Sequence, residues 1–186
     1  MTNKMVINLL NLLGFQVCWW LLILYQDQYW WVVAAMLCCH LLLVRGWASE
    51  LLIMLCVAVT GLLTDSLLTL SGVYIFSDAG QLLPVPFWLG LLWAAFAATL
   101  RHSLGYLRKH YGLAAGLGAI GGTSSYVAGM QLGAVSFGPE LSVVVGLLVV
   151  VWALLTPLIY LLTEYVEATS IHIIQGKPER DSKEIQ

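Results

Sequence analysis

The sequence predicts an all-α, polytopic membrane protein with six transmembrane helices and both termini in the cytoplasm. The composition is the first observation: 60% of the 186 residues are hydrophobic, 10% are charged, and the mean hydropathy is +0.88. Such a surface requires lipid as its solvent, which excludes an ordinary soluble domain. The charge distribution is the second observation, because all eight Lys and Arg residues fall on one side of a six-span map. Positively charged loops stay in the cytoplasm during insertion, which fixes the orientation.

Six apolar segments form one predicted transmembrane domain over residues 1–166. An α-helical span needs about 20 residues to cross ~30 Å of hydrocarbon, so six spans leave no room for a soluble domain. Residues 167–186 are polar, and we expect a cytoplasmic tail that is disordered from Lys177 onward. The predicted spans are 5–25, 29–44, 51–71, 86–107, 111–134 and 141–165.

The connections between these segments support the order of the spans. The first segment is too long for the apolar region of a signal peptide and no small-x-small site follows it, so we interpret it as a retained helix. The turns at 26–28 and 45–50 are short, which makes successive helices antiparallel neighbours. The outer loop 71–86 is too apolar to extend into water, and we expect it at the interface or folded back over the bundle.

The fifth segment differs from the others because glycine punctuates it. Gly112 and Gly116, and then Gly118 and Gly122, form two small-xxx-small patterns, which permit close helix approach. We therefore expect a central, tightly packed helix there.

Several classes of chemistry are excluded by the absence of their motifs. The chain has no H-E-x-x-H, G-x-S-x-G or P-loop pattern. Its four cysteines lie inside predicted spans without a C-x-x-C pair, which argues against a disulfide-forming membrane enzyme. The few basic residues are explained by topology, so we expect no nucleic-acid partner. The expected partners are membrane lipids and a lipid or small-molecule ligand.

Inserting an ionisable residue into the hydrocarbon core costs ~2.5–3.5 kcal/mol on insertion scales, so each such residue in a predicted span is a candidate for a function. With a rise of 1.5 Å per residue, His40, Arg101 and His102 lie ~5–8 Å to the cytoplasmic side of the middle of their spans. Asn11 and Thr156 lie at similar depth, and Glu50 is close enough below this layer to reach Arg101 or a histidine, with Arg101 as the expected partner. We predict an inner polar site here, in which the catalytic residues are His40, His102 and Glu50 and the binding residues are Arg101, Asn11 and Ser103.

A second polar group lies nearer the membrane centre. Asp65 and Ser66 lie ~6–8 Å to the outer side of the middle of their span, and no Lys or Arg shares their depth. We therefore expect Asp65 to be buried, to face the fifth segment, and to be neutral or hydrogen-bonded. The further binding residues predicted for this layer are Gln16, Ser124 and Tyr126.

Other interpretations of the inner site stay open. Arg101 could extend its guanidinium to the headgroups, Glu50 could be a helix N-terminal acid favoured by the dipole, and His40 could be a buried neutral histidine. Two imidazoles and a carboxylate could bind a metal in principle. Because no i,i+4 histidine pair is present, we predict no metal ligands and favour a histidine–carboxylate acid/base pair.

These polar positions also carry a resemblance to a bacterial membrane family. The chain resembles the domain of unknown function 2878 family over about residues 5–165. The resemblance implies a small proteobacterial inner-membrane protein, and the frequent position of family genes beside genes for fatty-acyl-chain modification hints at lipid handling. The residues that carry it are His40-x9-Glu50, Gly61-x3-Asp65-Ser66, the stretch 98–104, Gly121-Gly122-x3-Tyr126 and Leu132-Gly133-Ala134.

Three functions follow as hypotheses. The first is a lipid- or isoprenoid-handling protein, with or without catalysis, whose Arg101 binds a phosphate or carboxylate head group. The second is a small-solute transport or capture subunit that uses Asp65 at midplane. The third is a scaffold in which the polar residues only hold helices together. The sequence leaves the cofactor, the reaction and the oligomeric state open.

We predict that a reporter fused after Gln186 reads as cytoplasmic, because every basic segment belongs to that side. In a variant without the four native cysteines, Ser77→Cys should be labelled by an impermeant thiol reagent from outside. A periplasmic reporter signal, or labelling of this cysteine only from the inside, would contradict the topology.

Overall fold

The computed structural model describes residues 2–77 and 84–175, with side chains from residue 3 to residue 169 outside the gap. The all-α prediction is confirmed. Two 3-10 helices, η1 (Gln26–Gln28) and η2 (Gly105–Lys109), interrupt the helical order. The α-helices are α1 (Thr2–Tyr25), α2 (Trp30–Leu43), α3 (Trp47–Leu70), α4 (Phe87–Leu100), α5 (Tyr111–Gln131) and α6 (Leu141–Gln175).

Three helical stretches are long and apolar enough to cross a membrane: Asn3–Gln28, Trp47–Leu70 and Leu141–Thr169. Together they indicate a protein embedded in a membrane. The apolar helices α2 and α4 have 14 residues each, which corresponds to about 21 Å of helix, less than the ~30 Å of a hydrocarbon core. The count of six spans and the orientation of the termini stay predictions.

Two predicted segments end elsewhere in the structure. The segment 86–107 is helical only to Leu100; a turn and then η2 follow, because Arg101 and Ser103 bind polar side chains of other helices. The last helix continues to Gln175, past the predicted end at 165, so Glu167 is a helical residue. The expected disorder from Lys177 falls outside the described residues.

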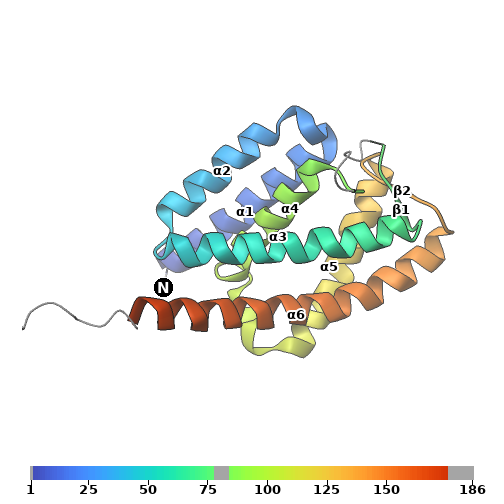
Figure 1. Cartoon of the computed structure of the whole chain (residues 1–186). Helices are drawn as coiled ribbons and strands as arrows, with labels where there is room; N and C mark the ends of the chain where they lie inside the picture. The colour runs from blue at the N-terminus through green and yellow to red at the C-terminus, as the bar shows by residue number, and fades with distance from the viewer. Residues whose placement is uncertain (1, 78–83, 176–186) are drawn as a thin grey trace, which may run out of the picture.

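The helices form a bundle with two distinct ends (Figure 1). The start of α1, the end of α2, the start of α3 and the end of α6 lie at one end, on the left in Figure 1. A two-stranded antiparallel sheet lies at the other end, where β1 (Tyr74–Ile75) pairs with β2 (Ser136–Phe137). Val73, Tyr74, Phe76 and Val85 are buried, so the described part of loop 71–86 folds back over the bundle.

The central helix is α4, which corrects the expectation for the fifth segment. Helix α4 contacts α1, α2 and α3, and most of its residues from Trp88 to Leu100 are buried. Helix α5 instead packs mainly along α6. Of its two glycine pairs only Gly118 and Gly122 make a close approach, against Thr156 and Trp152 of α6. Gly112 and Gly116 face open space among the described residues, because α5 lies at the edge of the bundle.

We predict that Gly122→Ala destabilises the protein, because an added Cβ would overlap the Trp152 ring. Overpacking of this kind typically costs about 1–3 kcal/mol. The matched control is Gly116→Ala, whose Cβ would meet no described atom within 4 Å. The control should gain up to ~1 kcal/mol from its higher helix propensity. Thermal unfolding in detergent compares them, and equal midpoints would contradict the α5–α6 contact.

Candidate functional site

The buried carboxylate of Glu50 on α3 contacts side chains from two other segments, α2 and the turn after α4. Glu50 lies in the first turn of α3 and is 1% exposed. Its Oε1 atom is 3.0 Å from Nε2 of His40 and 3.3 Å from Nε2 of His102. Its Oε2 atom accepts a 2.6 Å hydrogen bond from Nη1 of Arg101. The pairing of Arg101 with Glu50 is the one that the sequence predicted, and both predicted histidines join it.

Local chain geometry explains how these residues meet. Helix α2 ends at Leu43, and Gly46, with a φ of +80°, reverses the chain into α3. Because that turn is short, the last turn of α2, which carries His40, lies beside the first turn of α3, which carries Glu50. Arg101 and His102 approach from the point where α4 ends. The two imidazole rings contact each other edge to face, with centroids 5.2 Å apart.

A second set of ion pairs extends this site to the last helix. Nε of Arg101 lies 2.6 Å from Oε1 of Glu167, and Arg108 bridges Glu167 and Glu164. Tyr111 donates a 2.9 Å hydrogen bond to Glu164. Glu167 is absent from the predicted site because residues 167–186 are expected to form a polar tail. The signal was present, since Glu164 and Glu167 are three residues apart and share one face if the helix continues.

Asn11 and Ser103 also meet, but they stabilise the chain near the site rather than line its centre. The Ser103 hydroxyl donates a 2.7 Å hydrogen bond to Oδ1 of Asn11, and Nδ2 of Asn11 donates to the carbonyl of Ala98 at 3.0 Å. The second of these bonds satisfies a backbone carbonyl near the end of α4. Thr156, expected at the same depth, instead donates to the Trp152 carbonyl of its own helix.

Glu50, His40, Arg101 and His102 are together called the Glu50 cluster. An open groove of about 920 Å³ runs between α1, α2 and α4 and reaches this cluster. Most of its lining is apolar, including Ile7, Leu10, Trp31 and Leu37. The polar residues that line it are His40, Arg101, His102, Asn11 and Arg45.

Asp65 is buried in a separate site, as predicted. It is 2% exposed, and each carboxylate oxygen accepts one hydrogen bond: 2.7 Å from Nε1 of Trp93 and 2.6 Å from the hydroxyl of Tyr126 on α5. The Tyr126 ring stacks on that of Tyr74, with centroids 4.8 Å apart. The predicted contact with the fifth segment is thus confirmed, whereas the partner Trp93 was not anticipated.

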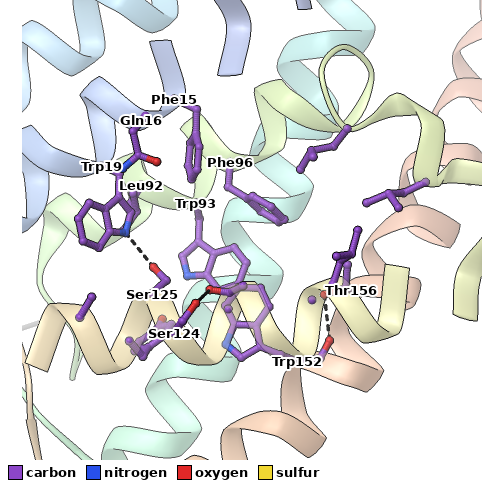
Figure 2. Close-up of a pocket in the computed structure, with 18 of the residues that line it drawn as sticks. Phe15, Gln16, Trp19, Leu92, Trp93, Phe96, Ser124, Ser125, Trp152 and Thr156 are labelled. Carbon is purple, nitrogen blue, oxygen red and sulfur yellow. Dashed lines mark hydrogen bonds between the residues drawn. The ribbon is translucent and has the colours of Figure 1, made fainter. Parts of the chain in front are cut away.

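The other predicted midplane residues do not join Asp65. Ser66 is half-buried, and Gln16 and Ser124 are exposed. The Ser124 hydroxyl donates to the carbonyl of Gly121 in its own helix. Gln16 and Ser124 instead border an aromatic cavity of about 690 Å³, which Tyr126 also lines. Figure 2 shows its walls, formed by Phe15, Trp19, Trp93, Phe96 and Trp152 from helices α1, α4 and α6.

Comparison with known proteins gives one match. The family model described as "Protein of unknown function (DUF2878)" matches residues 8–158. Neither a curated protein nor a solved structure matches the chain. The matched range contains His40, Glu50, Asp65, Arg101 and His102, and it ends before Glu167.

We predict that Arg101→Ala lowers the free energy of unfolding by about 3–5 kcal/mol, because it removes the cation from a buried carboxylate. Arg45→Ala, at an exposed position, is the control and should cost at most ~1 kcal/mol. Equilibrium unfolding in detergent measures both variants. A similar small loss in the two would mean that Arg101 does not balance the Glu50 charge.

We predict that Asp65→Asn folds, because the hydroxyl of Tyr126 can accept from the new amide while Trp93 still donates to its oxygen. Asp65→Leu should be less stable by about 1–3 kcal/mol for each buried donor left without a partner. Thermal unfolding of the two variants makes the comparison. If the asparagine variant is as unstable as the leucine variant, the charge of Asp65 is itself structural.

Proposed function

Since the chain belongs to the DUF2878 family, of unknown function, we propose its function from its own residues. We propose that it is an integral protein of the bacterial inner membrane, with both termini cytoplasmic, and that it binds and modifies a lipid or other hydrophobic small molecule. The observation that carries the proposal is the apolar groove that ends at His40, Arg101 and His102.

The size and lining of the groove favour an amphipathic ligand. Ligand sites commonly measure ~300–1,000 Å³ and combine apolar walls with a few polar groups, and the volume of about 920 Å³ falls in this range. Apolar residues of α1 and α2 suit an acyl or isoprenoid chain. The polar residues at one end suit its head group.

The charge distribution supports an inner-leaflet ligand. The groove ends where basic residues gather, and such residues mark the cytoplasmic side. Arg101 already balances Glu50 and Glu167. We therefore assign Arg101 to orienting Glu50, and assign the exposed Arg45, which also lines the groove, to an anionic head group.

The Glu50 cluster supports proton transfer as the chemistry. A histidine held by a carboxylate is a common general base or acid. His40 and His102 both approach Oε1 of Glu50 and both line the groove. In this proposal the histidines contact the ligand, while Glu50 fixes their orientation.

Transport of a small solute at Asp65 has less support. Both carboxylate oxygens of Asp65 accept hydrogen bonds from Trp93 and Tyr126. A pure scaffold is the remaining alternative, and it accounts for the ion pairs but not for a groove that opens onto them.

We expect deletion of the gene to change the membrane lipid profile, and wild-type complementation to restore it, as measured by lipidomics. His102→Ala should fail to restore the profile although the variant reaches the membrane at wild-type levels. Asp65→Asn should restore it, as should His110→Ala, which removes an imidazole outside the cluster.

Other outcomes would replace this proposal. Restoration by His102→Ala together with failure of Asp65→Asn would favour transport. Failure of both variants with reduced protein levels would favour a scaffold.

A further inference from the structure

Three potential metal-ligating atoms converge in the Glu50 cluster. They are Nε2 of His40, Nε2 of His102 and Oε1 of Glu50, and all lie within 4.8 Å of one another. They come from α2, from the turn after α4, and from α3. Glu50 Oε1 is 3.0 Å from one nitrogen and 3.3 Å from the other.

The two oxygen–nitrogen separations match those of ligands around a transition metal. Bonds of about 2.0–2.1 Å separate two ligand atoms by about 3.0 Å at a right angle and about 3.4 Å at the tetrahedral angle. Hydrogen bonding explains only part of the arrangement. His40 is hydrogen-bonded to Glu50, but Nε2 of His102 is shielded from solvent and makes no hydrogen bond of acceptable geometry to the described residues.

We propose that His40, His102 and Glu50 bind one divalent transition-metal ion, zinc or ferrous iron. Two imidazoles and one carboxylate form a set that both metals use with positions left open. This proposal replaces the expectation of no metal ligands. The sequence allows two imidazoles and a carboxylate from three helices in principle, and the absence of an i,i+4 histidine pair was the argument against such a site.

The surroundings of the three ligands suit a dication. Oε2 of Glu50 is held by Arg101 at 2.6 Å, which leaves Oε1 directed at the histidines. Outer contacts of this kind orient metal ligands in proteins. Among the described residues, the connected ion-pair network contains Glu50, Glu164 and Glu167 with Arg101 and Arg108. Counting only these carboxylates and guanidiniums, its formal charge is −1.

The ion would lie at the polar end of the groove, since both histidines line it. With both Nε2 atoms bound to the ion, the ion rather than the histidines would act on the ligand, by polarising a head-group oxygen or activating a bound water. This use of the ion rests on the proposed function. Binding of the ion depends only on the three ligands, so the two proposals can fail separately.

The test uses the full chain, purified in detergent with an affinity tag that contains no histidine. After treatment with a chelator, the protein is titrated with Zn²⁺ and with Co²⁺, and the bound metal is counted by elemental analysis. We expect one ion per chain, with a cobalt absorption spectrum typical of nitrogen and oxygen ligands. His40→Ala and His102→Ala should each weaken binding by more than the ~10–100-fold typical of outer-shell changes.

His110→Ala is the matched control and should bind as the wild type does, because His110 contacts the Tyr106 carbonyl and not the cluster. Thermal unfolding of the metal-free variants identifies any that fail to fold, and Glu50→Gln provides a third ligand change in that case. Substoichiometric binding by folded wild type, or equal affinity in folded His102→Ala, would overturn the metal site. A lipid profile that still depends on His102 would then leave the proposed function standing.

Discussion

The burial of one carboxylate constrains much of this bundle. An ionised group of this kind is stable in a low-dielectric interior only if cations and hydrogen-bond donors surround it. Glu50, at 1% exposure, meets this requirement with Arg101 and two histidines. The chain must leave the α4 helix at Leu100 to present these partners, and Arg101 in turn recruits Glu167 from α6. Charge compensation therefore joins α2, α3, α4 and α6 at one end.

Toward the other end of α3, hydrogen bonds to a second buried carboxylate hold the helices together. Asp65 has no cation among the described residues near it, and its oxygens accept hydrogen bonds from Trp93 and Tyr126 instead. Trp93 fits against α3 because Gly61 has no side chain there. Stacking of Tyr126 on Tyr74 then connects this site to the small sheet. A single buried acid thus ties α3, α4, α5 and β1 together.

The sequence predicted the helical class and the grouping of the inner polar residues, because composition and helical rise depend only on the chain. It placed His40, Arg101 and His102 in one layer with Glu50 close below, and the structure brings these four side chains together. Depth does not fix rotation about the helix axis or the choice of neighbouring helix. That is why Gln16 and Ser124, at suitable depth, do not reach Asp65.

Two further features required three-dimensional packing. Glu167 was missed because its helical role depends on Arg101 and Arg108, which are distant in sequence. The end of α4 was not predicted because most of residues 101–107 are apolar or uncharged, so their sequence does not indicate a helix end. The contacts that end the helix are made with side chains on α1 and α3. The helix propensity of a local segment does not depend on residues far away in the sequence, so it cannot predict these contacts.

The composition of the Glu50 cluster argues for a site rather than a structural ion pair. One guanidinium suffices to balance one carboxylate, and Arg101 already lies 2.6 Å from it. His40 is hydrogen-bonded to the other carboxylate oxygen, which a purely structural site would also need. His102 adds a second imidazole at the same oxygen without a hydrogen bond of acceptable geometry to the described residues, although burying a polar ring without such a bond is costly. A scaffold would be better stabilised by an apolar side chain in place of His102, so the second histidine, which borders the groove, supports the ligand that we propose.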